Sequence, residues 1–106
     1  MKQMSNLLPF RLSKVAEKNL KKIKKTDRIL FEKIEIAIET IREDPDVGDR
    51  KLGDLEGYFC VNVHHLRVEY RICYTVEEDE NGDLVVIIMI GPRENFYRDL
   101  KRYLSF

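Results

Sequence analysis

Two neighbouring stretches, residues 58–64 and 68–76, alternate between apolar and polar side chains along their length. A period of two predicts β-strands that bury one face and leave the other face polar. Only three residues separate the two stretches, so we expect them to pair as an antiparallel hairpin. This hairpin constrains the fold strongly, because a shift of one residue in its pairing would turn the apolar face toward solvent.

A turn near Leu66 and Arg67 predicts one register for this hairpin. On one face the register makes three apolar pairs, which are Phe59 with Tyr74, Val61 with Ile72, and Val63 with Tyr70. On the other face it pairs Cys60 with Cys73, Asn62 with Arg71, and His64 with Glu69. The partners match in character, as cross-strand neighbours should, and His65 falls on the apolar side. Leu66 and Arg67 are poor residues for a two-residue turn, so we expect a longer or bulged loop.

The N-terminal part of the chain predicts a short strand followed by two helices. Residues 7–12 form the strand, and Pro9 places it at a sheet edge because proline cannot donate to a ladder. Ser13 is a good N-cap for a first helix, and either residue of Thr26-Asp27 can cap the second. The second helix ends at Asp44-Pro45, since the residue before proline avoids the helical region.

The C-terminal part completes a single domain of the α+β class. Residues 46–57 form a loop, and residues 84–90 are apolar on both faces, so we expect them to be the central, most buried strand. Residues 95–104 predict a short final helix. The order is β-α-α-β-β-β-α: a small antiparallel sheet with an N-terminal helical hairpin on one face and a short C-terminal helix. Residues 1–106 make one domain of ordinary size.

Charge is distributed unevenly, although the net charge is zero. Residues 1–28 carry nine Lys and Arg against two Asp and Glu, whereas residues 29–57 carry four against nine. A basic segment of this kind can guide a polyanion toward a neutral protein. Solvated helix faces that differ in sign explain the same pattern equally well.

Several classes of protein are excluded or disfavoured by the sequence. The longest apolar runs fall short of the roughly 20 residues that cross a bilayer, and the N-terminus lacks a signal-peptide layout. Two cysteines make neither a disulfide framework nor a zinc site, and two adjacent histidines are weak evidence for a metal. We therefore expect a cytoplasmic protein that is not associated with a membrane and binds no metal or cofactor.

The predicted register gathers Asn62, His64, Glu69 and Arg71 on the sheet face away from the two helices. Such a cluster suits cleavage of RNA by its own 2′-hydroxyl, which needs a proton acceptor, a proton donor and fixed positive charge. Arginine holds phosphate through a planar fork and stays charged. Arg71, Arg93, Tyr97 and His64 supply these groups.

Three segments of the chain carry a family resemblance. The strand LRVEYRICYTV, the following apolar strand and the ending GPRENFY resemble the RelE/ParE superfamily of bacterial and archaeal type II toxins. The earlier KLGDLEGY is similar to the lead-in of that family. The resemblance implies a compact RelE-like toxin domain that enters the ribosomal A site and cuts mRNA without a metal. It also implies a cognate RelB-like antitoxin that wraps the toxin and keeps it silent, with a heterotetramer as one arrangement of the complex.

The resemblance also implies roles for individual residues. Arg71 matches the strand arginine that holds the scissile phosphate, and Arg93 matches a second phosphate arginine. Tyr97 matches the C-terminal tyrosine that stacks on or protonates the substrate. Lys51 lies near the lead-in lysine of the family, and we place it with Arg67 and Asn62 among the RNA-binding residues.

This chain departs from RelE at the strand that reads YFCVNVHH, which lacks the lysines that RelE uses there. His64 is our candidate to substitute for them as the base. Two alternatives stay open besides an endoribonuclease. The first is a ParE-like toxin that poisons gyrase by binding, because one fold hosts both activities. The second is a degenerate, non-catalytic member that only binds an antitoxin.

Overall fold

The computed structural model describes residues 7–105, and residues 1–6 and 106 lie outside the described part of the chain. The elements in chain order are β1 (Phe10–Leu12), α1 (Lys14–Thr26), α2 (Arg28–Glu43), β2 (Asp49–Arg50), the 3-10 turn η2 (Gly53–Leu55), β3 (Phe59–His65), β4 (Val68–Asp79), β5 (Gly82–Pro92) and α3 (Phe96–Leu104). The predicted α+β class and the predicted order of elements are confirmed. The structure adds only the very short β2 and η2 within the predicted loop.

The helical hairpin begins and turns where the capping residues predict. The Ser13 hydroxyl accepts a hydrogen bond from the Ala16 N–H at 2.9 Å and caps α1. Asp27, rather than Thr26, caps α2 by accepting from the Leu30 N–H at 3.1 Å. The buried stripe of α2 faces the sheet and consists of Leu30, Ile34, Ile38 and Ile41. Each such side chain contributes about 1.5–3 kcal/mol on burial, which holds the hairpin against the sheet.

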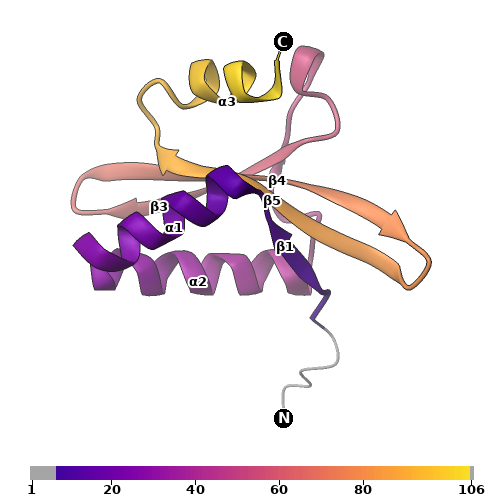
Figure 1. Ribbon diagram of the computed structural model, residues 1–106, viewed down its shortest axis with the longest axis horizontal. Coiled ribbons are helices and arrows are strands. Elements are labelled where there is room, and N and C mark those ends of the chain that lie inside the picture. Colours follow the sequence, from indigo (N-terminus) through magenta and orange to yellow (C-terminus); the bar gives the residue numbers. More distant parts are fainter. Residues whose placement is uncertain (1–6, 106) are drawn as a thin grey trace.

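The sheet is mixed, with strand order β1-β5-β4-β3-β2. Strand β1 pairs in parallel with β5 and so departs from the predicted antiparallel sheet, whereas the other three pairs are antiparallel as predicted. As Pro9 predicts, β1 lies at an edge. The prediction that residues 84–90 are the central strand is wrong, because β4 occupies the centre. Strand β5 is nevertheless buried from Val85 to Ile90, because strands flank it on both edges and helices cover both of its faces (Figure 1).

The predicted register of β3 and β4 is confirmed at all six pairs, from Phe59 with Tyr74 to His64 with Glu69. The prediction of a longer or bulged loop is wrong. Leu66 and Arg67 alone connect the strands, and both take left-handed backbone angles, with φ of 49° and 68°. A two-residue turn of this kind matches the right-handed twist of the hairpin, and the twist outweighs the poor propensity of these two residues. The irregularity falls instead between β4 and β5, at Cys73/Tyr74.

Two apolar layers lie on opposite faces of the sheet. The larger packs α1 and α2 against one face and includes Ile34, Ile72 and Ile87. The smaller packs α3 against the other face through Phe96 and Leu100. Figure 1 shows α1 and α2 on one side of the sheet and α3 on the other, while the β4–β5 hairpin extends beyond both. The short α3 therefore leaves part of its sheet face uncovered, and the polar residues of β3 and β4 lie there.

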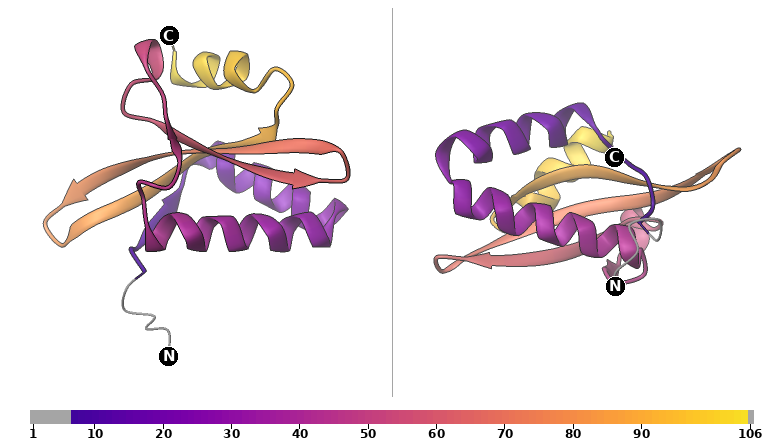
Figure 2. Two further views of the ribbon diagram at one scale, coloured as in Figure 1. Left: turned by 180° about the vertical axis from the view of Figure 1, so that it is seen from behind. Right: turned by 90° about the horizontal axis from the view of Figure 1, so that it is seen from below.

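The segment after α2 crosses the sheet edge and carries the chain from the helical-hairpin face to the α3 face (Figure 2). The buried Tyr74 hydroxyl holds its start by donating to the Pro45 carbonyl at 2.7 Å and accepting from the Gly48 N–H at 3.0 Å. Position 48 requires glycine, because a Cβ there would lie 2.6 Å from the Tyr74 hydroxyl. Beyond this crossing, the Lys51 N–H donates to the Tyr58 carbonyl at 2.9 Å. The crossing thereby brings Lys51 to the face that bears Arg71.

Candidate functional site

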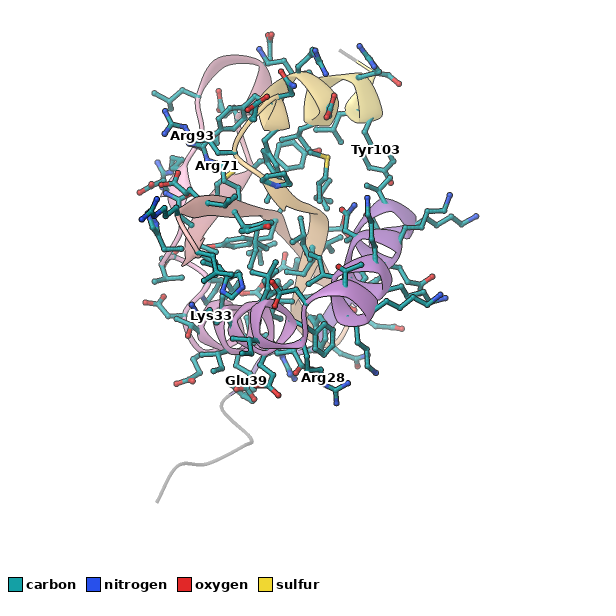
Figure 3. All side chains as sticks on the ribbon, turned by 90° about the vertical axis from the view of Figure 1, so that its left-hand side faces the viewer. Arg28, Lys33, Glu39, Arg71, Arg93 and Tyr103 are labelled. Atoms are coloured by element: carbon teal, nitrogen blue, oxygen red, sulfur yellow. The ribbon has the colours of Figure 1, made fainter. Side chains whose placement is uncertain are left out.

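The hairpin register brings four polar side chains together on the α3 face. The Arg71 Nε donates to Asn62 Oδ1 at 3.4 Å, and Arg71 Nη2 lies 3.5 Å from Glu69 Oε2. The other oxygen of Glu69 lies 3.9 Å from His64 Nδ1. Figure 3 shows Arg71 and Arg93 on the opposite side of the sheet from Arg28, Lys33 and Glu39 of α2. The prediction of a polar cluster away from the two helices is confirmed.

The two-residue turn also explains why these side chains approach one another. In such a hairpin the pair next to the turn is hydrogen-bonded, and the pairs then alternate along the ladder. His65 and Val68 form that first pair, so His64 with Glu69 and Asn62 with Arg71 are both non-hydrogen-bonded pairs. Side chains of non-hydrogen-bonded pairs lie closer together. The turn therefore places the polar face at the positions of closest cross-strand contact.

Arg71 is held between the sheet and the first turn of α3. Its side chain is only 17% exposed, and its guanidinium carbon lies 4.7 Å from the centroid of the Tyr97 ring. Lys51 Nζ lies 5.1 Å from the same centroid. Two cations therefore contact one aromatic ring, and a hydrogen bond with the Tyr97 hydroxyl raises the pKa of Lys51 above its usual value. Lys51 is thus firmly protonated at neutral pH.

Tyr97 takes this position because its neighbour Phe96 anchors α3. Phe96 is almost fully buried, and its ring meets the Tyr97 ring edge-on with 5.7 Å between centroids. The preceding Asn95 adopts a left-handed backbone conformation with φ of 61°, which turns the chain from β5 into α3. The predicted final helix is confirmed, and its packing rather than its sequence pattern determines which way Tyr97 faces.

Arg93 and Arg67 lie at the rim of an open cavity of about 650 Å³ next to the cluster. His64, Glu69 and Glu94 also line this cavity. The Arg93 N–H donates to the Glu69 carbonyl at 2.8 Å, which fixes the backbone at the start of the segment leading to α3. The His64 side chain is 76% exposed at this rim. Two arginines and a histidine therefore line the cavity, and Glu69 connects it to Arg71.

His65 lies on the apolar side, as strand phase predicts. It is buried, and its Nε2 lies 2.8 Å from Asp27 Oδ2, the carboxylate that caps α2. This contact joins the end of β3 to the turn between the two helices. His65 is therefore a structural residue, and it takes no part in the polar face.

The arrangement can bind and stabilise an anion through its own cationic side chains. In residues 7–105 no group of three or more His, Cys, Asp or Glu is placed to hold a metal ion. Arg71 and Lys51 supply fixed positive charge at the Tyr97 ring, and Arg93 supplies it at the cavity. Tyr97 and His64 supply groups that can exchange protons. Within the same residues no helix is both long and apolar enough to cross a lipid bilayer.

The sequence predicted the residues of this candidate site, but it did not predict two features of their packing. The contact of Lys51 with Tyr97 joins positions far apart in the chain, and no periodicity connects them. The burial of Cys60 and Cys73 beneath α3 was missed as well. The predicted register already paired those cysteines. The amphipathic character of residues 96–104 was the signal that could have shown that a helix covers them.

Comparisons with known proteins agree with this fold. A family described as "ParE-like toxin of type II bacterial toxin-antitoxin system" matches residues 11–101. No curated protein matches. Among solved structures, a YoeB/ParE toxin from Agrobacterium tumefaciens is similar with a TM-score of 0.70 and 19% identity, covering 81% of this chain and 99% of that one.

Two further structures show the same fold. The toxin-antitoxin complex RelBE2 from Mycobacterium tuberculosis gives a TM-score of 0.62 and 26% identity, over 82% of this chain and 99% of that one. A mutant of the E. coli toxin RelE in the free state gives 0.68 and 17%, over 92% of this chain and 98% of that one. The family match spans most of the chain, and the sheet, the helical hairpin and α3 agree with it. This chain belongs to the ParE-like toxins of type II bacterial toxin-antitoxin systems.

Proposed function

We propose that this toxin is a metal-independent endoribonuclease that cuts mRNA in the ribosomal A site. The observation that carries the proposal is the position of Arg71. Its side chain is largely buried, is oriented by Asn62 and Glu69, and packs on the Tyr97 ring, and Glu69 in turn lines the open cavity. A planar cation fixed in this way is suited to a phosphodiester whose charge increases during cleavage, because its donors need no reorganisation.

The proposed chemistry is attack of the RNA's own 2′-hydroxyl on the adjacent phosphorus. Arg71 and Arg93 hold the phosphate and stabilise the transition state. His64 takes the 2′ proton, and Glu69, 3.9 Å from its Nδ1, orients the imidazole. Tyr97 protonates the leaving 5′ oxygen while its ring supports Arg71. Lys51, Arg67 and Asn62 bind the flanking RNA.

The proposed partners are the ribosome with its mRNA and a cognate antitoxin. The solved relative RelBE2 is a toxin-antitoxin complex, which supports a RelB-like antitoxin for this chain. A heterotetramer of two toxins and two antitoxins is the arrangement we propose for the silent form. The basic helix α1 lies on the opposite side of the sheet from Arg71, and it offers a second positive surface for ribosomal RNA.

The deciding experiment compares growth and mRNA cleavage after expression of the wild type, Arg71→Ala and Arg11→Ala. Arg11 is a matched control, because it is an exposed arginine paired with Glu77 far from the site. We expect Arg71→Ala to lower cleavage of translated messages about 10²- to 10³-fold, the usual effect of removing one preorganised donor. Arg11→Ala should behave as the wild type. Equal cleavage by wild type and Arg71→Ala would exclude the proposed chemistry.

A gyrase poison is the second candidate, favoured by the ParE-like description of the matching family. A poison of this kind would act by binding and would need no proton transfer. Purified toxin added to gyrase in a supercoiling assay separates the two candidates. Inhibition of supercoiling with intact mRNA would favour the gyrase poison, whereas cleaved mRNA with normal supercoiling would favour the nuclease.

A further inference from the structure

The two cysteines form a buried thiol pair beneath the site, and the proposed RNA chemistry does not use them. Cys60 of β3 and Cys73 of β4 are register partners and both belong to the apolar layer under α3. They are 3% and 0% exposed, and neither is in a disulfide.

The ladder places this pair at a distance suitable for a covalent bond. Counting from the hydrogen-bonded pair at the turn, His65 with Val68, Cys60 with Cys73 is a non-hydrogen-bonded pair. Cα atoms of such pairs lie about 4.5 Å apart, and disulfides accept separations of about 4.4–6.8 Å. The two thiols can therefore join without any movement of β3 along β4.

The surroundings distinguish the two sulfurs. Cys60 lies opposite Cys73 in the ladder, and interactions with Cys73, the Lys51 ammonium, the Tyr97 hydroxyl and Arg71 all lower the pKa of the Cys60 thiol. These groups hold the pKa of Cys60 below its usual value despite burial. The hydrogen bond to Cys60, together with burial, raises the pKa of Cys73. These opposite shifts make Cys60 the more acidic thiol of the pair, and thiolate is the nucleophilic form of cysteine.

We propose that Cys60 and Cys73 are a redox modification site, which hydrogen peroxide converts to a cross-strand disulfide that a thiol reductant reverses. The Cys60 thiolate attacks one oxygen of the peroxide, the O–O bond breaks, and the departing hydroxide takes a proton to become water. Cys60 is then a sulfenic acid. The Cys73 sulfur attacks Cys60 Sγ, the S–O bond breaks, and the Cys73 proton leaves with the hydroxyl group as a second water. The two thiols lose two electrons, and the peroxide gains them.

Tyr97 controls access to this pair. Its side chain packs on the layer that contains both cysteines, and its hydroxyl faces Cys60. A peroxide that approaches Cys60 on this side must therefore pass Tyr97 or wait for α3 to open. Because Tyr97 also supports Arg71, the thiol pair lies directly under the anion-binding side chains. The inference concerns only the thiols, so it stands or falls independently of the RNA cleavage proposed above.

The experiment exposes folded, reduced protein to hydrogen peroxide and follows intact mass and free thiols. The wild type should lose two hydrogen atoms and both thiols, and dithiothreitol should restore them. Its Tm should rise by about 10 °C on oxidation, as expected for a crosslink that closes a short loop in a domain of this size. Wild type that keeps both thiols, or that adds only oxygen atoms, would overturn the proposal.

Variants then test the assigned roles under the same conditions. Cys73→Ser should stop at a sulfenic acid on Cys60 that dimedone traps, and Cys60→Ser should leave Cys73 unmodified over the same time. Neither variant should show the oxidative rise in Tm. Tyr97→Ala should accelerate disulfide formation, because it uncovers Cys60. Equal reactivity of the single-cysteine variants would refute the role of Cys60 as the attacking thiol.

Discussion

Tyr74→Phe removes one hydroxyl from the centre of the molecule and tests how the segment carrying Lys51 is held. Tyr74 is fully buried, and its ring stacks on Phe59 with 5.4 Å between centroids. Its hydroxyl donates to the Pro45 carbonyl at 2.7 Å and accepts from the Gly48 N–H at 3.0 Å. Phenylalanine keeps the stacking and the volume but leaves both backbone groups without this partner.

The expected cost follows from those two hydrogen bonds. Each contributes about 0.5–1.5 kcal/mol net, and a buried polar group left unsatisfied costs about 1–3 kcal/mol. The free energy of unfolding should therefore fall by about 2–4 kcal/mol, a large part of the roughly 5–15 kcal/mol that stabilises a typical domain. With an m-value of about 1–3 kcal/mol/M in urea, the midpoint should fall by about 0.7–4 M.

Urea unfolding followed by circular dichroism measures this loss, and Tyr103→Phe is the matched control. Tyr103 is 42% exposed, so removing its hydroxyl should change the free energy of unfolding by less than about 0.5 kcal/mol. The m-value should stay the same in both variants. A Tyr74→Phe variant no less stable than Tyr103→Phe would refute the reasoning that this hydroxyl holds the segment after α2.

Three further predictions concern the helical hairpin, the turn and the site. Hydrogen bonds from the Leu30 N–H and, second, from His65 lower the pKa of Asp27 in the folded protein. The Asp27 carboxylate therefore stabilises the fold at pH values above the pKa of the unfolded state, and this stabilisation is lost as the pH falls through the pKa of the folded state. Asp27→Asn should therefore reduce stability at pH 7 and flatten its decline on acidification, as urea titrations at several pH values would show. Replacing Leu66 and Arg67 together by Asn and Gly should raise the free energy of unfolding by about 1–2 kcal/mol, since both native residues have positive φ. An unchanged free energy of unfolding would show that the native turn is not strained. Tyr97→Phe keeps the ring on Arg71 but should lower RNA cleavage about 10²-fold or more if the hydroxyl is the acid; unchanged cleavage would leave the ring only a supporting role.

Much of the fold could be predicted because its signals are local. The alternation in residues 58–64 and 68–76 determined the β3–β4 register, and Ser13, Asp27 and Pro45 marked the helix ends. Two expectations failed where local rules compete with the sheet. The twist of the hairpin favoured a two-residue turn at Leu66 and Arg67. The edge strand β1 paired with β5, so β4 rather than β5 is the central strand. Strand hydrophobicity reports burial, but it does not report the order of strands.

In the candidate site, too, some contacts follow from local sequence patterns and others only from tertiary packing. Arg71, Asn62, Glu69 and His64 share one face because they alternate along paired strands, and the sequence by itself determined that grouping. Only the tertiary structure decided that Tyr97 packs on Arg71, that Lys51 meets the same ring, and that the opposed cysteines lie beneath them. Those contacts depend on where α3 docks and how the segment after α2 crosses the sheet edge. Such docking is set by packing between residues distant in the chain, which leaves no periodic trace in the sequence.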